Sequence, residues 1–492
     1  MKYLRLILSI ALTLPFVMRC DAQLLVGSIR GTISDSSGAA IANAQVTLVQ
    51  KETNFLRQTQ SNDEGYFELP DLQSGTYSMT AMKSGFQAFK ADDIILTAGQ
   101  IRRIDVAMPI GSATANVTVT EGAAVIQTEG AVLHETLSSK DYLEKPWIGT
   151  GINPLLLLTV DPLVQNTGGG LYSFEIAGQP TQQTAYNVDG VGSDGSLNGT
   201  NVFFYKEANV AGGNSSSEFP RATQINLISH QGTDKFHGVF QYWYLGTGLT
   251  AKDYFAVTKP ETIIKNEDLQ LSGPIWKDKT LFLFIFEGQQ VPGSTYVLQT
   301  VPTSAMRTGD FSQLLTGTNP VMIHDPVTKA PFPGNIIPSD RINSVSSNVI
   351  SSYIPSPNLG GPGALSNNYG YVFPYPGGDY YDLNNYMGRI DQHLTKNNSF
   401  FVRWQLAIPY YVLNGNYPSL FSTEVRHTYN FVVEDTHIFS PRFVNTARFG
   451  LYQPNATIGG TVDGKTPLTG NAAINNVGRV LSASMRDLVW RC

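Results

Sequence analysis

The strongest constraint on the fold is the odd–even alternation of side chains beyond residue 234. Within residues 268–273, leucine and glycine share one parity and polar side chains take the other. A short polar break at 276–279 follows, and phenylalanine then occupies every second position (Phe282, Phe284 and Phe286). Because successive side chains of a strand point to opposite faces of a sheet, the pattern predicts a hairpin whose strands each carry two chemically different faces.

The same pattern recurs and predicts a series of paired strands. We expect seven of them, at about 235–246, 262–273, 280–290, 382–393, 399–409, 427–438 and 442–453. Tight turns alternate with longer loops, and the segment 291–381, rich in Pro, Gly, Ser and Asn, is by far the longest. Transmembrane β strands need about nine to eleven residues, and outer-membrane barrels have short turns on one side and long loops on the other. The sequence therefore favours an antiparallel transmembrane β barrel over a soluble sandwich or propeller, with 291–381 as an extracellular loop.

Charged residues within these strands share the parity opposite to the apolar ones. Arg403 alternates with Val402 and Trp404, and Ile390 separates Arg389 from Asp391. A charge that faced lipid at mid-depth would cost roughly 2–4 kcal/mol. We therefore predict that four residues face the lumen, in contact with an internal domain or substrate or in structural salt bridges: Arg389, Asp391, Arg403 and Arg448.

The N-terminus has the features of an export signal. Lys2 and Arg5 precede an apolar run at 6–17, and Ala22 follows the small residue Cys20 by two places. This predicts a signal peptide at 1–22, cleaved before residue 23, since the run is shorter than the ~20 residues that a spanning helix needs. Lipidation of Cys20 is the alternative. After cleavage Cys492 is the only cysteine left, which excludes an intramolecular disulfide.

Three further segments lie between the signal and the strands. Residues 25–110 alternate short strand-like runs with glycine turns, which predicts a small β sandwich. Residues 111–130 are a small, polar linker, and 131–233 indicate a compact α+β unit with a helix near 138–144. With the strands of 234–492, the predicted fold class is mainly β.

Several function classes are disfavoured by composition and motifs. The net charge of −6 gives no basic footprint for nucleic acid. The glycines at 168–170 lack the Lys-Ser/Thr of a phosphate-binding loop. The histidine–acid pairs at 134–135 and 324–325 are isolated. We therefore expect neither enzymatic activity nor a metal or other cofactor.

Two family resemblances account for most of the chain. Residues 25–110 resemble a carboxypeptidase regulatory-like domain, on twelve positions: Gly31, Asp35, Gly38, Val46, Leu48, Gly65, Phe67, Leu72, Gly75, Tyr77, Gly85 and Phe86. The chain as a whole resembles a TonB-dependent outer-membrane receptor of the Oar-like type. The stretches that carry this resemblance are FEIAGQPTQQTAYNVDGV, SEFPRATQINLISHQGTDKFHG, LQLSGPIWKDKTLFLFIFEG, VPTSAMRTGDFS and PFPGNIIPSDRI.

The second resemblance implies a location, a mechanism and partners. Such receptors lie in the outer membrane, in contact with its lipid, and a plug domain, here 131–233, fills the barrel. They bind an extracellular ligand, such as a glycan, peptide or siderophore, and import it when a TonB-type energy-transducing complex pulls a short strand. The candidate for that strand, the TonB box, is Asn116, Val117, Thr118, Val119 and Thr120, with an ordinary strand or linker as the alternative. The competing function is surface adhesion or assistance to protein export without active uptake.

The sequence departs from the family pattern in two places. The chain has Glu-Phe-Pro-Arg at 218–221, where relatives commonly have an acidic-Phe-Gly-Arg element, and proline fixes φ and removes a donor. Family barrels close with about twenty-two strands, and seven cannot close around a plug. We therefore expect a C-terminally truncated fragment of such a receptor, with no assignment for residues 456–492.

Overall fold

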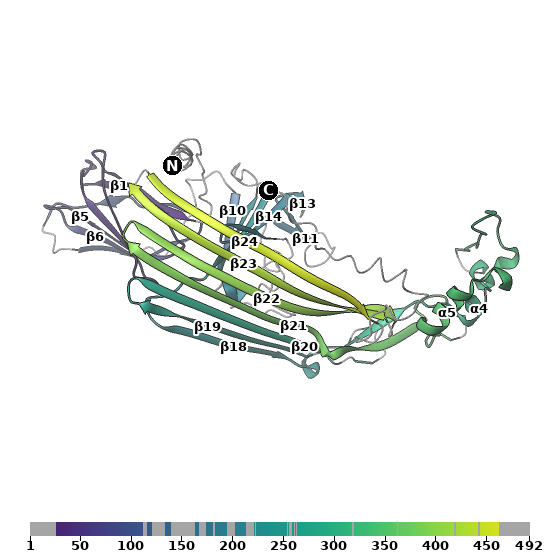
Figure 1. Ribbon diagram of the computed structural model, residues 1–492. Helices are drawn as coiled ribbons and strands as arrows, with labels where there is room; N and C mark the ends of the chain where they lie inside the picture. Colours follow the sequence, from purple (N-terminus) through teal and green to yellow (C-terminus); the bar gives the residue numbers. More distant parts are fainter. Residues whose placement is uncertain are drawn as a thin grey trace, which may run out of the picture.

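The fold is described by a computed structural model and consists mainly of β strands (Figure 1). The residues that the structure describes are 26–111, 116–120, 133–138, 163–166, 174–180, 183–193, 202–212, 221, 223–252, 254, 258–259, 261, 263–316, 319–361, 363–417, 420–440 and 443–461. The predicted signal peptide, Cys20, Cys492, residues 139–144 of the predicted helix and residues 218–220 lie outside them. No helix in the described part of the chain is long and apolar enough to cross a membrane.

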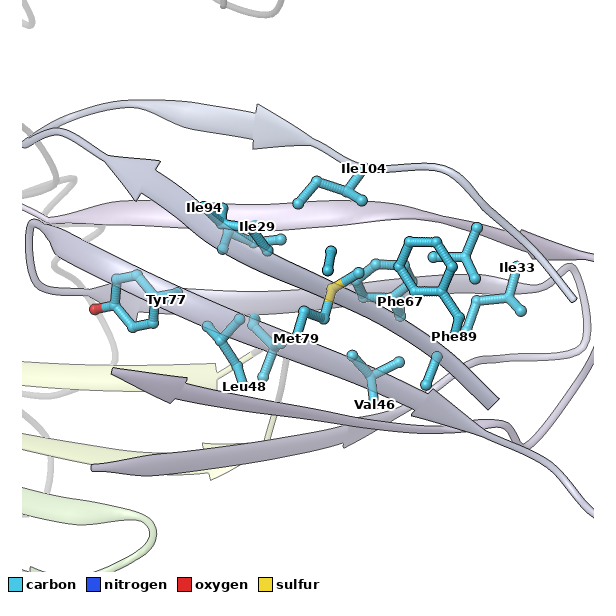
Figure 2. Packing of buried hydrophobic residues seen from close by; sticks show 14 of the residues in the cluster. Ile29, Ile33, Val46, Leu48, Phe67, Tyr77, Met79, Phe89, Ile94 and Ile104 are labelled. Atoms are coloured by element: carbon cyan, nitrogen blue, oxygen red, sulfur yellow. The ribbon is translucent and has the colours of Figure 1, made fainter. Parts of the chain in front are cut away.

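The N-terminal region forms a sandwich of two sheets. One sheet contains β1 (Gly27–Ser34), β4 (Tyr66–Leu72), β7 (Ile101–Arg103) and β8 (Val106–Ala107). The other has the order β3 (Leu56–Gln60), β2 (Gln45–Gln50), β5 (Gly75–Met82), β6 (Ala88–Leu96) and β9 (Asn116–Thr120). Every second residue of β1 is buried, and Figure 2 shows these side chains meeting those of the opposite sheet. The β sandwich expected from the sequence is therefore present.

One glycine of the sandwich is required by a close backbone approach. Gly31 lies in β1, and a Cβ atom built on it would lie 1.8 Å from the carbonyl oxygen of Ile104. The backbone of Ile104 donates a hydrogen bond to the carbonyl of the adjacent Arg30. A side chain at position 31 would therefore push apart two segments that the hydrogen bond holds together.

A second five-stranded sheet, called here the inner sheet, follows the sandwich. Its order is β10 (Leu133–Ser138), β16 (Tyr205–Gly212), β17 (Thr223–Ser229), β14 (Thr184–Val188) and β15 (Val191–Ser193). β14 and β17 run parallel, and the other pairs are antiparallel. A small sheet of β11 (Val164–Asn166), β12 (Phe174–Ile176) and β13 (Gln179–Pro180) accompanies it, and η4 (Val202–Phe204) precedes β16. Six of the seven residues of β17 are buried, because both faces of this strand are covered.

The remaining strands form one antiparallel sheet of seven, called here the outer sheet, which follows chain order. It contains β18 (His237–Leu245), β19 (Ile264–Trp276), β20 (Thr280–Gln299), β21 (Tyr369–Thr395), β22 (Asn398–Tyr417), β23 (Leu420–Ser440) and β24 (Phe443–Thr461). Among the described residues, the predicted number, order and pairing of these strands are confirmed. The expectation of a longer loop at 410–426 is wrong, because β22 and β23 remain paired as far as Tyr417 and Leu420. β24 continues to Thr461, into the segment from 456 that the sequence left unassigned.

The predicted limits of the long loop were wrong. β20 and β21 remain paired as far as Gln299 and Tyr369, so the connection covers 300–368 rather than 291–381. Pro292 and Pro374 interrupt the odd–even alternation at register shifts of this hairpin. The outer half of the hairpin was therefore not predicted from the sequence. The connection also has its own structure, with α4 (Ser304–Arg307), η6 (Ser312–Leu315), η7 (Pro333–Asn335), η8 (Ser339–Arg341) and α5 (Ser344–Tyr353).

The two ends of the outer sheet carry different structures. The sandwich, purple in Figure 1, lies at the end with the short turns that join β19 to β20 and β21 to β22. The connection that contains α4 and α5 projects from the opposite end. The inner sheet lies against one face of the outer sheet, as their shared apolar core shows. The outer sheet therefore has one covered face, one free face and two distinct ends.

Candidate functional site between the inner and outer sheets

The alternation in the outer sheet places chemically different side chains on its two faces. On β21 and β22, Met387, Arg389 and Arg403 are buried, whereas Ile390 and Trp404 are 43% and 44% exposed. Trp404 lies over Gly388 of the neighbouring strand, where an added Cβ would lie 2.4 Å from the indole nitrogen. Arg389 and Arg403 thus lie with Met387 on the covered face, whereas Ile390 and Trp404 lie on the free face.

Apolar residues of both sheets form one core on the covered face. Leu283 and Ile285 of β20 and Met387 of β21 belong to a buried cluster whose other members include Tyr186, Val188, Phe204, Val210, Ile225 and Leu227. The phenylalanines of β20 take the opposite parity; Phe286 contacts Tyr386 at 5.2 Å between ring centroids. The inner sheet is therefore held to the outer sheet by burial of apolar surface, which is the main favourable term in folding.

A buried ion pair joins the two sheets beside this core. Nε of Arg403 lies 2.5 Å from Oδ2 of Asp189, and both side chains are almost fully buried. Arg403 also donates to Oδ1 of Asn430 at 2.8 Å. Burial opposes ionisation of Asp189, but the guanidinium groups of Arg403 and Arg389 overcome it and hold the pKa of this carboxyl below its ordinary value.

Asp189 is positioned by the turn that follows β14. Its φ is 46°, in the left-handed region that aspartate tolerates better than most residues. Its backbone N–H donates to the carbonyl of Leu227, and its Oδ1 accepts from the N–H of Ser229 at 2.9 Å. The residue that holds this turn therefore also provides the counter-ion of Arg403.

Arg389 and Asp391 lie beside this pair. Arg389 binds Asp391 at 2.7 Å and donates to Oγ of Ser229 at 2.9 Å. Its guanidinium lies 4.0 Å from the ring centroid of Phe401. Oδ2 of Asp391 accepts from the N–H of Gly232 at 2.9 Å. The two residues thus bind the chain where it leaves the inner sheet and enters the outer one.

Arg448 has a different partner from the other three predicted residues. It forms an ion pair at 2.5 Å with Glu434, the residue opposite it on the adjacent strand β23. Both residues lie near Arg389 and Asp189, because all four line one small cavity together with Lys206. The four predicted residues therefore all lie on the covered face, and each is paired with a residue of opposite charge.

The candidate TonB box lies in another part of the molecule. Its five residues form β9, which pairs in parallel with residues 88–92 of β6. It is the last strand in the order of its sheet. The structure therefore does not bring Asn116–Thr120 to the Asp189–Arg403 pair.

A second hollow, which no sequence pattern indicated, lies in the connection between β20 and β21. Uncharged polar and apolar residues line it: Thr303, Ser304, Ala305, Gln313, Ser356, Pro357, Asn358, Leu359, Gly361, Gly363 and Ala364. Arg307 donates hydrogen bonds to the carbonyl oxygens of Ile350 and Ile354 and so links α4 to the end of α5. The lining contains no charged side chain among the described residues, so it is suited to neutral polar groups.

The described part of the chain contains no recognisable metal-binding site. No group of three or more His, Cys, Asp or Glu residues lies there in an arrangement that could hold a metal ion. Arg389 and Arg403 instead form ion pairs with Asp391 and Asp189, and Asp391 also accepts from a backbone N–H.

Comparison with known proteins agrees with the sequence motifs. Residues 228–486 match the model of a family described as outer membrane beta barrel domain, and residues 28–109 match that of the carboxypeptidase regulatory-like domain. The chain is 24% identical over 305 residues to the TonB-dependent transporter Oar of Myxococcus xanthus. That alignment covers 58% of this chain and 28% of the relative, so the chain spans well under half of the relative's length. The resemblance to the Oar-like type is thereby confirmed.

Solved structures with a similar arrangement include two receptors. The siderophore receptor PirA from Pseudomonas aeruginosa aligns with a TM-score of 0.37 at 11% identity, covering 66% of this chain and 42% of the receptor. The alcaligin outer-membrane receptor FauA from Bordetella pertussis aligns with a TM-score of 0.40 at 10% identity, covering 67% of this chain and 40% of the receptor.

Proposed function

Because this chain belongs to the outer membrane beta barrel domain family, and is therefore an outer-membrane protein, we propose that it is part of a receptor that imports an extracellular ligand. The import is coupled to a TonB-type energy-transducing complex. The matched relative is named a TonB-dependent transporter, which supports this choice over a purely structural role.

The observation that carries the proposal is the attachment of the inner sheet to the covered face of the outer sheet. In a closed barrel that face is the lumen, and a folded domain within the lumen blocks free diffusion. The inner sheet then acts as the plug of the receptor. The Asp189–Arg403 pair and the shared apolar core keep it in place between transport events.

The pulling contact is assigned to Asn116–Thr120. Recognition by strand addition needs an extended segment with free backbone donors and acceptors. β9 is extended and is paired on one side with β6 in the described structure. It is also the strand through which the sandwich leads toward the inner sheet, so force on it reaches both.

Ligand capture is assigned to the connection between β20 and β21. This connection lies at the end of the outer sheet opposite to the sandwich (Figure 1). Its hollow is lined by uncharged residues, of which Thr303, Ser304, Gln313, Ser356 and Asn358 are polar. This lining favours a glycan or a peptide backbone over a ferric siderophore among the three ligand classes. The orientation implied is sandwich in the periplasm and connection outside the cell.

An uptake assay in cells tests the proposal. Cells that make the full gene product are given labelled oligosaccharides, oligopeptides or ferric siderophores, with and without a protonophore. Val117→Pro with Val119→Pro removes two backbone donors, and is expected to abolish energy-dependent uptake while surface binding remains. Val117→Ala with Val119→Ala keeps the donors and serves as the matched control. Unchanged uptake in the proline variant would contradict TonB coupling, and binding without any energy-dependent uptake would favour adhesion or export assistance.

A further inference from the structure

The sandwich contacts the outer sheet at two of its short turns. Nδ2 of Asn54 donates to Oδ1 of Asp278 at 2.8 Å, in the turn between β19 and β20. Nη1 of Arg57 donates to the carbonyl oxygen of Lys396 at 3.0 Å, in the turn between β21 and β22. Between these contacts, the ring of Phe55 stacks on that of His393 with centroids 4.0 Å apart. One short segment of the sandwich, residues 54–57, therefore bridges two hairpins of the outer sheet.

The sandwich also contacts the inner sheet, through strand β16. Glu207 of β16 accepts from the N–H of Ala98 at 2.9 Å, and Asn209 donates to the carbonyl of the same residue at 2.9 Å. Lys206 donates to the carbonyl oxygen of Ser74 at 2.8 Å. Three polar or charged side chains within four residues of β16 thus bind backbone groups in two turns of the sandwich.

The two kinds of contact differ from the one that unites the inner and outer sheets. Residues of the inner and outer sheets share one apolar cluster, whereas the apolar cluster of the sandwich contains only residues of the sandwich itself. Among the described residues, the two clusters have no member in common. When a polar contact is broken, water replaces each partner and the net cost in free energy is small. When a shared apolar core is separated, apolar surface is exposed to water and the cost is larger.

We propose that the N-terminal sandwich is a releasable latch on the inner sheet. In the docked state it ties β16 to the short-turn end of the outer sheet. In the released state it moves away as a folded body, and the inner sheet loses the contacts that hold this end while its apolar core remains intact.

Two buried charges of β16 favour such a release. Burial lowers the pKa of Lys206 and raises the pKa of Glu207, which means that both charged forms are disfavoured in the docked state. Water restores their hydration when the sandwich leaves. The latch depends on the contacts alone; only its link to transport, in which a pull on β9 would release it, rests on the proposed function.

Hydrogen–deuterium exchange of the purified protein in detergent micelles tests the latch without ligand or TonB. The release variant is Asn54→Ala with Asn209→Ala, which removes one hydrogen bond from each contact. We expect exchange in β16 and in residues 97–100 to rise about tenfold, because local opening governs their protection. Exchange in β1, β2 and β20–β23 should remain as in the wild type. Asn62→Ala is the matched control. The side-chain amide of Asn62 forms hydrogen bonds only within one turn of the sandwich among the described residues, so this variant should affect only that turn.

A disulfide lock gives the opposite test. Asn54→Cys with Asp278→Cys, made with Cys492→Ser, should close the first contact covalently. The oxidised protein is expected to exchange more slowly in β16 than the wild type, and reductant should reverse the effect. Two results would overturn the latch. One is a joint loss of protection in the sandwich core or the outer sheet, which would mean one cooperative unit. The other is exchange in β16 that responds to neither variant.

Discussion

Arg403 of the outer sheet and Asp189 of the inner sheet form an ion pair at 2.5 Å, and both side chains are almost fully buried. Each charge compensates the cost of burying the other. The pair lies beside an apolar core that the same two sheets share. The apolar core holds the two sheets together, and the ion pair specifies the position of the inner sheet on the outer sheet.

Removal of one partner of this pair should be more harmful than removal of both. Arg403→Met leaves Asp189 buried without its closest cation, which we expect to lower the free energy of unfolding by about 3–5 kcal/mol. Arg403→Met with Asp189→Asn removes both charges and should restore a large part of that loss; asparagine tolerates the positive φ at 189. Denaturant unfolding in micelles, followed by tryptophan fluorescence, measures both. A double variant as unstable as the single one would show that the pair acts through packing alone.

The stability of the inner sheet should fall in mild acid because of His230. Burial, followed by the nearby charges of Lys206 and Arg389, lowers the pKa of His230 to about 4. The unfolded chain, with a pKa of about 6.5, then binds a proton that the folded chain does not. Stability is therefore full above about pH 7 and falls, by an amount on the order of 1–3 kcal/mol, as the pH drops from 6.5 towards 4. His230→Gln should flatten this slope in unfolding experiments between pH 4 and 7.5. His237→Gln, at an exposed position of β18, is the control, and an unaltered slope in His230→Gln would contradict the assignment.

The sandwich should not tolerate a side chain at position 31. The Cβ of Gly31→Ala would lie 1.8 Å from the carbonyl oxygen of Ile104, so β1 and the segment before β8 must separate. We expect a loss of at least about 2 kcal/mol in the stability of the sandwich, at the upper part of the range for overpacked sites. Thermal unfolding measured by circular dichroism reports the loss. Gly248→Ala, with open space around the added atom, should behave as the wild type.

The connection between β20 and β21 should depend on one buried amide. Asn335 donates to the carbonyls of Phe311 and Val321 and accepts from the N–H of Ile323. Asn335→Ala removes the partner of the Val321 carbonyl and of the Ile323 N–H, at about 1–3 kcal/mol for each group that stays dry, whereas the carbonyl of Phe311 still accepts from the N–H of Leu314. We expect rapid proteolysis within 300–368 in intact protein, while the outer sheet resists. Asn348→Ala, on the exposed side of α5, should remain protected, and equal resistance of both variants would refute the role of Asn335.

Much of the outer sheet was predictable because its information is local. An alternation with a period of two residues predicts that a segment is a strand, and it shows which of its side chains share a face. That was enough to predict seven strands and to assign Arg389, Asp391, Arg403 and Arg448 to one face, where the structure finds them. The outer half of the β20–β21 hairpin escaped prediction because prolines and register shifts interrupt the period there.

The sequence by itself thus determined the strands, their two faces and the family to which the chain belongs. Only the tertiary structure decided which distant groups meet: Asp189 with Arg403, Gly31 with Ile104, Glu207 with Ala98. The physical reason is that alternation fixes the direction of a side chain relative to its own strand. The identity of its partner depends on how separate sheets are seated against one another, and no local pattern contains that relation.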